Sequence, residues 1–404
     1  MRKLIFIVIV VITSVTYLNA QNSDKEIKFG GRIMYDMAIW GPDNFENAGS
    51  EVRRVRLFSS GTMYQNVEYK LQLDFANKDV SWKDIFIQLN KLPLTKGSLR
   101  IGHFKEPLRL EVLTSSKYIT FMERSLSNTF LPERNSGVMY NTNIENKISL
   151  QAGVFSNGYN FGNELWNYNI NVNGRITYLA INNENQLLHL GLASSKRKSS
   201  NHTYGFSTRA ENHLGTKLLQ PEFTDVDETN ILGAEIAYVR NRLSLQGEYL
   251  RTTVSETPEM ELHSTEYELN GYYGQVSYFL TGESRPYKSS YAGFSRVKPN
   301  NNYGSNGKGA IELVGRISKM DLSNAEKGIL DSKTIGVNWY LNPNTRVMFN
   351  YVMGELSENN ETFLAINSHQ PFDGDLAWYE AHINSQEGWN IIGGLFPGSP
   401  VVLV

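Results

Sequence analysis

Three arginine residues near the start of the chain are spaced so that they could act together. Arg32 falls on the charged face of an alternating segment at 27–39. Arg54 and Arg56 share one face of the next segment, so Arg53 is expected to point the other way. Neighbouring antiparallel strands would bring these side chains close to one another. A guanidinium group is planar, permanently charged and able to donate two parallel hydrogen bonds to one oxyanion. The cluster therefore predicts binding of anions such as phosphate.

The same arginines could instead be neutralised by acidic side chains. The carboxylates available for such pairs are Asp36, Glu68, Asp74, Glu106, Glu111 and Glu123. On the charged faces of the alternating segments, basic and acidic residues are nearly balanced in number. A surface that selects anions and a surface that admits small solutes without selection are therefore both open.

The elements that would carry these residues show alternation with a period of two. Val67, Tyr69 and Leu71 take one face of a segment, while Glu68 and Lys70 take the other. In a soluble sandwich the apolar face fills a core, whereas in a membrane barrel it meets lipid. The segments are long, and short turns alternate with longer polar loops. Both features favour tilted membrane-spanning strands over the shorter strands of a sandwich.

We therefore expect an all-β fold, a transmembrane antiparallel β-barrel of about 16 strands. The expected strands span 27–39, 52–63, 65–76, 81–90, 97–104, 136–143, 146–156, 168–180, 186–196, 229–240, 242–254, 265–282, 309–319, 332–341, 345–355 and 374–384. An additional strand at 204–212 would break the up-and-down order, so that segment is assigned to an external loop. The segment 283–307 is then an unusually long connection on the short-turn side, which is the weakest point of this topology.

Composition excludes several other classes of protein. The chain has 404 residues, a formal net charge of −2 and no cysteine. It is therefore neither a disulfide scaffold nor a thiol enzyme, and its charge does not suit a nucleic-acid binder. After residue 20 no apolar run is long enough for a membrane-spanning helix.

The first twenty residues have the pattern of a secretory signal. Arg2 and Lys3 are followed by an apolar run at 4–12 and by the small residue Ala20. This order predicts export and cleavage after Ala20, which would leave Gln21 as the new terminus. A retained membrane anchor is the alternative, but the apolar run is short for a span.

Residues 102–138 form a connection that is too long for a hairpin. It includes the runs Gly102-His103-Phe104-Lys105-Glu106-Pro107, Phe121-Met122-Glu123-Arg124-Ser125 and Leu131-Pro132-Glu133-Arg134-Asn135. Six further runs occur on either side of this connection, in order along residues 27–355: Phe29-Gly30-Gly31-Arg32-Ile33, Arg53-Arg54-Val55-Arg56-Leu57, Leu245-Gln246-Gly247-Glu248-Tyr249, Gly282-Glu283-Ser284-Arg285-Pro286-Tyr287, Gly309-Ala310-Ile311-Glu312-Leu313 and Asn338-Trp339-Tyr340-Leu341. With these runs, the sequence resembles the phosphate-selective porin O and P family.

The resemblance implies a trimeric porin in the outer membrane of a Gram-negative-type bacterium, with its third external loop folded into the lumen. Residues 105–135 are the candidate for this constriction loop. The positions that match the family's anion-binding residues are Arg32, Arg54, Arg56, Lys105, Ser115, Ser116, Lys117, Arg124 and Arg134. The implied partners are outer-membrane lipid, small anions such as phosphate and two further copies of the chain, with no nucleic acid.

The expected organisation is a signal peptide at 1–20, a barrel at 21–386 and an atypical tail at 387–404, which ends on Val404 rather than on an aromatic residue. No catalytic residue, metal or cofactor is expected, because the His residues are scattered and no nucleophile motif occurs. Two other functions remain as alternatives: a structural or adhesive barrel without an open pore, and a secreted carbohydrate-binding sandwich.

Overall fold

The computed structural model describes residues 26–40, 47–76, 80–156, 170–198, 201–257, 265–304, 306–358, 361–364 and 378–386. The expected signal peptide at 1–20 and the tail at 387–404 lie outside these residues. No helix in the described part of the chain combines the length and the apolar character that a membrane crossing requires.

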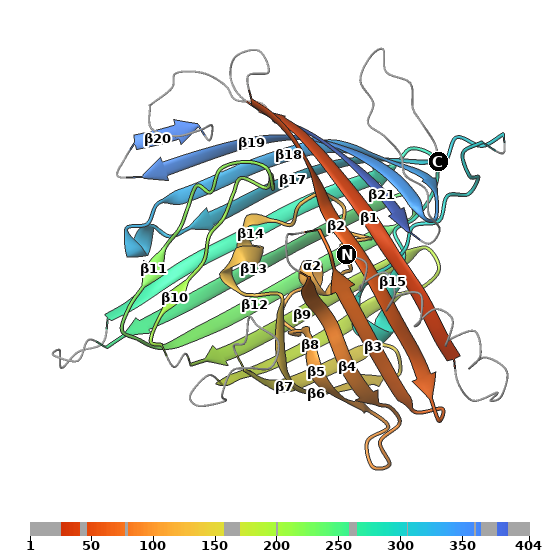
Figure 1. Ribbon diagram of the computed structural model, residues 1–404, viewed down its shortest axis with the longest axis horizontal. Helices are drawn as coiled ribbons and strands as arrows, with labels where there is room; N and C mark the ends of the chain where they lie inside the picture. Colours follow the sequence, from red (N-terminus) through yellow and green to blue (C-terminus); the bar gives the residue numbers. More distant parts are fainter. Residues whose placement is uncertain are drawn as a thin grey trace, which may run out of the picture.

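One antiparallel sheet of 17 strands contains nearly all of the described structure (Figure 1). The strands of its first half are β1 (Glu26–Trp40), β2 (Asn47–Met63), β3 (Val67–Asp74), β4 (Ser81–Leu89), β5 (Ser98–Lys105), β6 (Arg134–Ile144), β7 (Ile148–Ser156), β8 (Ile170–Asn182) and β9 (Gln186–Arg197). Those of its second half are β12 (Val226–Arg240), β13 (Leu243–Glu256), β14 (Thr265–Phe279), β17 (Ala310–Asp321), β18 (Ile329–Asn342), β19 (Thr345–Glu358), β20 (Glu361–Leu364) and β21 (Trp378–Gln386).

The sheet closes on itself. Each strand pairs with its neighbours around the ring, and β21 pairs with both β19 and β1. The short strand β20 pairs only with the end of β19, so it extends the sheet without adding a position to the ring. A closed sheet leaves no unpaired edge, which is the condition for crossing lipid with strands. The expected all-β antiparallel barrel is thus confirmed.

The two faces of the wall have the polarity of a membrane protein. On β8, the inward residues Asn171, Asn173 and Arg175 are 0–3% exposed, whereas the outward residues Val172 and Ile176 are 55% and 46% exposed. A soluble sandwich would bury the apolar set instead. Buried polar and exposed apolar side chains on one strand therefore favour the barrel over the sandwich.

Connections follow the expected alternation of short turns and long loops. The segment at 204–212 contributes only the small strand β10 (Tyr204–Gly205), which pairs with β11 (Glu222–Phe223) outside the main sheet. The long connection between β14 and β17 carries β15 (Tyr287–Lys288), the 3-10 helix η2 (Ser289–Tyr291) and β16 (Gly293–Phe294). The up-and-down order therefore holds across this segment.

Part of the ring is filled by apolar side chains. Residues 106–133, hereafter the inner loop, contain α2 (Leu110–Leu113) and the 3-10 helix η1 (Leu126–Phe130). From η1, Leu126 and Phe130 pack with Phe223 of the external loop and with Leu250 and Leu269 on the inner face of β13 and β14. This cluster fixes the inner loop against the β12–β17 side of the barrel (Figure 1).

We expect Ile176→Arg to destabilise the barrel in phospholipid vesicles by about 2–4 kcal/mol, because it places a charge on the lipid-facing wall near the middle of a strand. Denaturant-induced unfolding monitored by tryptophan fluorescence would measure the loss. Glu184→Arg, in the exposed turn after β8, is the matched control and should change stability little. Equal stability of the Ile176→Arg variant and the wild type would show that the outer face does not contact lipid.

Candidate functional site

The candidate site begins with the arginine residues of β1 and β2. Arg32, Arg54 and Arg56 lie on the inner face of the wall and are only 6–7% exposed. The strand register pairs Arg32 with Arg56 and Met34 with Arg54, so the three side chains occupy adjacent positions on two strands. Like charges at this spacing repel one another, and they persist only where other interactions hold them.

These three arginines differ in how many of their hydrogen-bond donors find an acceptor in the protein. Arg56 Nε donates to Asp74 Oδ2 at 2.6 Å. For Arg54, the hydrogen bond from its guanidinium is a weak one to Met34 Sδ at 3.4 Å, and its Nε has no acceptor among the described residues. Arg32 Nε and Nη1 likewise lack an acceptor there. Buried donors without partners are costly and uncommon. Arg32 and Arg54 therefore present charged donors that an anion could satisfy.

Arg53 corrects one expectation from the sequence. Strict alternation places Arg53 on the outer face, away from Arg54. In the structure, Met34 of β1 pairs with Arg54 of β2, and the next residue, Tyr35, pairs with Val52. Arg53 is therefore the additional residue of a β-bulge in β2. A bulge of this kind redirects a side chain. Arg53 consequently faces the lumen, where its Nε donates to Glu123 Oε1 of the inner loop at 2.7 Å.

The inner loop is attached to the lumen wall at several points. The amide groups of Leu110 and Glu111 donate to the two carboxylate oxygens of Glu248 on β13, each at 2.7 Å. Further along the loop, carbonyl groups accept hydrogen bonds from wall side chains. These bonds are Asn338 Nδ2 to Thr120 O at 2.8 Å, Arg346 Nη1 to Ile119 O at 2.8 Å and Arg316 Nη2 to Glu123 O at 3.0 Å. The loop therefore crosses the inside of the barrel from β13 to β19.

Most of the predicted cations of the loop region bond to the loop itself. Lys105 Nζ donates to the carbonyl groups of Val112 and Thr114. Arg124 pairs with Glu133, and Arg134 bridges Glu133 and Asp84, with Nε to Asp84 Oδ1 at 2.7 Å. These contacts brace the loop, and Arg134 also lies close enough to Arg32 and Arg56 to repel them electrostatically.

The remaining predicted positions lie at the turn of the loop that follows α2. Ser115 Oγ accepts a long hydrogen bond from the Lys117 amide at 3.4 Å, and Ser116 is buried. Lys117 Nζ lies 5.9 Å from the ring centre of Phe58 on β2. The structure thus gathers Arg32, Arg54, Arg56 and Arg134 at one place. Ser115, Ser116 and Lys117 lie at the turn after α2, where Lys117 is beside Phe58, two residues along β2 from Arg56.

Two acidic residues of the inner loop face the arginine cluster. Burial would raise the pKa of Glu133, but Arg124, Lys105 and Arg134 outweigh it and hold the pKa well below its usual range. Burial is likewise outweighed at Glu123, whose pKa Arg53 and Arg54 lower. Both carboxylates are therefore ionised at neutral pH, and they neutralise part of the positive charge around them.

Several residues that position the loop were not singled out from the sequence. Arg109 is the clearest, since it donates to the carbonyl groups of Asn128, Leu131 and Pro132 while fully inside the protein. Burial lowers the pKa of Arg109 to about 10, which still leaves it charged at neutral pH. Its role depends on the folded path of the loop, for which the sequence carries no periodic signal.

Comparisons with known proteins agree with this architecture. The family of phosphate-selective porin O and P matches residues 27–366, and the penicillin amidase family matches residues 350–404. Porin O of Pseudomonas aeruginosa is 24% identical, in an alignment that covers 85% of this chain and 87% of that protein. An uncharacterised protein of Caulobacter vibrioides is 28% identical over 77% of this chain and 64% of its own length.

Solved structures show the same fold. An anion-selective porin from Comamonas acidovorans has a TM-score of 0.55 at 14% identity, with 90% of this chain and 99% of that chain covered. The trimer form of OmpT from Vibrio cholerae has a TM-score of 0.51 at 10% identity, with 90% and 100% covered. The closed ring, the inner loop and the match over residues 27–366 converge on one assignment: this chain belongs to the phosphate-selective porin O and P family and is a bacterial outer-membrane porin.

Proposed function

We propose that the porin prefers anions, phosphate among them, and that they pass between the inner loop and the wall formed by β1–β5. The observation that carries this proposal is the pair of buried arginines, Arg32 and Arg54, whose donors lack acceptors among the described residues. An oxyanion would supply those acceptors through charge-assisted hydrogen bonds. The names of two relatives, Porin O and an anion-selective porin, support the same direction.

The route along β1–β5 is inferred from where the larger apolar clusters fill the interior. A smaller cluster joins Phe86 of β4 and Phe104 of β5 to Met139 and Phe155. Apolar residues of the inner loop and the external loop pack against β12–β14 and β17. A second apolar cluster, formed by Leu110, Leu179, Ala237, Val239 and Phe294 with Leu187, packs α2 and β16 against β8, β9 and β12. The arginine cluster lies on the other side of the inner loop. In this proposal the loop narrows the lumen, and anions pass beside Arg32 and Arg54.

Non-selective diffusion is a second candidate because other lumen arginines are neutralised. Arg175 pairs with Glu235, Arg197 with Glu106 and Arg285 with Glu312. Such pairs leave little net field over much of the inner wall. Selectivity then depends on the few cations at the narrow part of the lumen, whose fixed charges act over a Debye length of about 8 Å at physiological salt. A plugged, purely structural barrel is the third possibility, and conductance measurements exclude or establish it.

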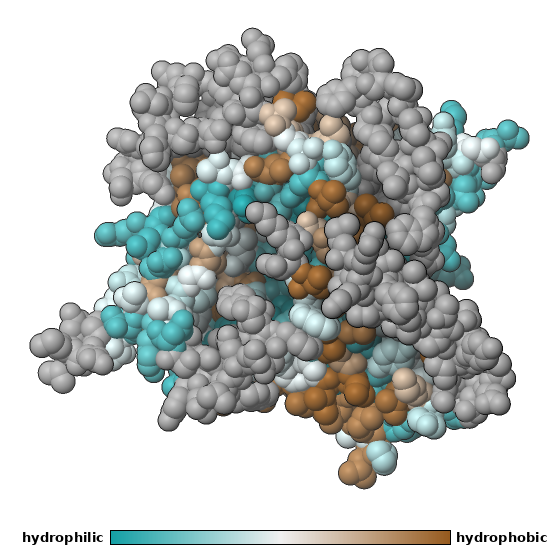
Figure 2. Space-filling view, viewed as in Figure 1, coloured by the Kyte–Doolittle hydropathy of each residue, from teal (hydrophilic) through white to brown (hydrophobic). Residues whose placement is uncertain are grey.

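We also propose that three copies assemble through β3–β5. β3 and β5 have 8 residues each and β4 has 9, whereas β12 and β14 have 15. An 8-residue strand is about 26 Å long and, when tilted, spans about 20 Å, which is less than the lipid-facing band of about 25 Å. Figure 2 shows apolar surface over this part of the wall, where Leu71, Ile87 and Ile101 are exposed. Contact with another copy would cover this apolar part of the wall, whose strands are too short to span the lipid-facing band.

The double variant Arg32→Gln/Arg54→Gln should move the zero-current potential under a salt gradient toward cation preference. It should also weaken block of chloride current by phosphate about tenfold, the usual scale for loss of a charged hydrogen bond. Planar bilayer recordings measure both quantities. The matched control is Arg251→Gln, since Arg251 is exposed and pairs with Glu268 near the end of β13. Unchanged ion preference in the double variant contradicts anion selection by these residues.

Arg53→Gln provides a second test in the same recordings. Because Arg53 pairs with Glu123, its removal leaves that carboxylate facing the lumen without its nearest cation. We expect a shift toward cation preference here too. Had Arg53 pointed away from the lumen near the external rim, as alternation predicts, the variant would conduct much as the wild type does.

Ile87→Asp should dissociate the trimer, because it places a charge in the proposed contact between copies. Native mass spectrometry of the detergent-solubilised protein would report the number of copies. Ile236→Asp on β12 is the matched control, as Ile236 is similarly exposed on the outer face but far from β3–β5 along the ring. If both variants remain trimeric, the contact lies elsewhere on the wall.

A further inference from the structure

The outer face of the barrel carries a row of ion pairs at its long-loop edge, hereafter the charged rim. Each pair joins two neighbouring strands, and together they cover β9, β12, β13, β14, β17 and β18, which are consecutive in the ring. Cations lie on β9, β13 and β17, and carboxylates lie on the strands next to them. The pairs are Lys196 Nζ with Glu228 Oε2 at 2.7 Å, Arg251 Nη2 with Glu268 Oε2 at 2.5 Å and Lys319 Nζ with Asp331 Oδ2 at 3.6 Å.

The charged rim begins where the apolar band of the wall ends. On β17, the next residue after Ile317 on the same face, toward the long loops, is Lys319; on β18, the next residue after Ile335 is the exposed Lys333. Ile317 and Ile335 are each 58% exposed on the outer face. Long loops mark the extracellular side of an outer-membrane barrel. The charged rim therefore lies at the depth of the lipid headgroups of the outer leaflet.

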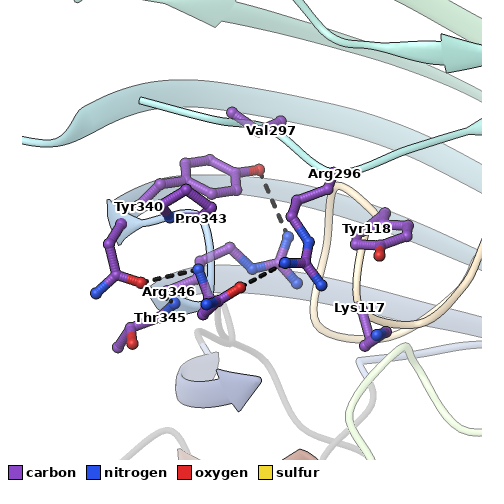
Figure 3. Close-up of a pocket in the computed structure, with 10 residues that line it drawn as sticks. Lys117, Tyr118, Arg296, Val297, Tyr340, Pro343, Thr345 and Arg346 are labelled. Carbon is purple, nitrogen blue, oxygen red and sulfur yellow. Dashed lines mark hydrogen bonds between the residues drawn. The ribbon is translucent and has the colours of Figure 1, made fainter. Parts of the chain in front are cut away.

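The short-turn edge of the same wall is built differently. Its outward positions include the aromatic residues Tyr278 on β14 and Trp339 on β18, with Arg240 as a cation on β12. Two further cations at this end, Arg296 and Arg346, lie inside the barrel, where Figure 3 shows them lining a pocket. Aromatic residues suit either membrane interface, whereas a row of charges at one edge indicates a different headgroup there. The two edges therefore fit an asymmetric bilayer.

The charged rim does not continue onto the part of the wall that is proposed to contact another copy. Among the described residues at the long-loop end of β3–β5, the exposed side chains are Val80 and Trp82, which carry no charge. The ion pairs thus lie on strands that face lipid in the proposed assembly. Their position fits a lipid partner better than a second copy of the chain.

Stability of the barrel does not account for these ion pairs. Arg251 and Glu268 have side chains that are 48% and 38% exposed, and exposed pairs contribute little because water solvates both partners. Each cation can therefore exchange its carboxylate for a stronger anion at small cost. A phosphate group, with close to two negative charges and three acceptor oxygens, is such an anion.

The spacing of the cations suits a headgroup with more than one phosphate. The ring order places Lys196, Arg251 and Lys319 on every second strand. Neighbouring strands are about 4.8 Å apart, so two strand spacings, about 10 Å, separate consecutive cations across the wall. A headgroup that carries phosphates at both ends of a sugar unit can contact two such cations at once.

We propose that the charged rim binds a phosphorylated glycolipid of the outer leaflet, with Lys196, Arg251 and Lys319 as partners of its phosphate groups. The acyl chains of the same lipid lie against the apolar band, at Leu192 and Ile317, so the wall holds both parts of the molecule. The inference is independent of the anion route, because these side chains lie on the outer face and not in the lumen.

Native mass spectrometry of the full chain in detergent tests the proposal, with bisphosphorylated lipid A as the probe. A chelator in the buffer removes divalent cations, so that carboxylates cannot bind phosphate through a metal ion. We expect Lys196→Gln/Arg251→Gln/Lys319→Gln to bind the lipid at least tenfold more weakly than the wild type does. Equal binding by the two proteins would overturn the proposal.

A matched triple variant controls for the loss of three positive charges. Lys147→Gln/Arg240→Gln/Arg242→Gln removes three exposed cations at the short-turn edge and should bind lipid A as the wild type does. An equal loss of binding in this variant would show that the location of the charge is unimportant and would contradict the charged rim as the site. Lys196→Arg/Lys319→Arg keeps the charge and should retain binding, which separates the loss of charge from a defect in assembly.

Two further probes identify the part of the lipid that is recognised. Lipid A without its phosphates should bind weakly, and equally so, to the wild type and to the Lys196/Arg251/Lys319 variant. Inorganic phosphate should not displace lipid A from the wild type, because it has no acyl chains for the apolar band to hold. Tight binding of the phosphate-free lipid would show that the wall contacts acyl chains alone, and displacement by inorganic phosphate would show a site for free anions. Either result overturns the proposal.

Discussion

The path of the inner loop depends on carboxylates buried in the lumen. Glu248 accepts the amides of Leu110 and Glu111, and Tyr273 donates a further hydrogen bond to it at 2.5 Å. Glu111 itself accepts hydrogen bonds from the Ser125 amide and hydroxyl groups and from Asn128, which fold the loop back on itself. Removing one partner of a buried charged network costs about 3–5 kcal/mol. The shape of the lumen therefore depends on acidic residues, although the proposed solute is an anion.

The arginines of the lumen fall into two groups according to whether they pair with a buried carboxylate. Arg175, Arg197 and Arg285 each pair with a carboxylate and hold strands or loops in place, although Arg285 Nε has no acceptor in the described part of the chain. Arg32, Arg54 and Arg346 retain donors without acceptors in the described part of the chain. Burial is similar in both groups, so exposure alone does not separate them. Pairing with a carboxylate does, because the first three arginines each have such a partner and no ion pair joins Arg32, Arg54 or Arg346 to a carboxylate among the described residues.

The strand order could be predicted from sequence because polar and apolar residues alternate along each wall strand, and because a closed barrel requires up-and-down connections. The ranges expected for β8, β9 and β19 differ from the observed bounds by only a few residues. Alternation fails at Arg53, since a bulge adds one residue to a strand without any distinctive sequence. It also fails within the inner loop. Arg109 and Arg124 were equally basic in the sequence, and only the folded loop shows that both donate to its own carbonyl groups.

The two inward segments enter from opposite ends of the barrel, yet they are in direct contact. Phe294 of the connection between β14 and β17 donates its amide to Thr114 Oγ1 of the inner loop at 3.3 Å, and Arg285 Nη1 donates to Tyr118 O at 3.2 Å. On the wall side, Tyr287 is hydrogen-bonded to His189 and Ala292 O accepts from Arg175, so the connection is anchored independently of the loop. A displacement of either segment must therefore alter the other. It follows that the interior of the barrel is shaped jointly by segments that enter from its two ends, and that the long connection on the short-turn side is a structural component of that interior.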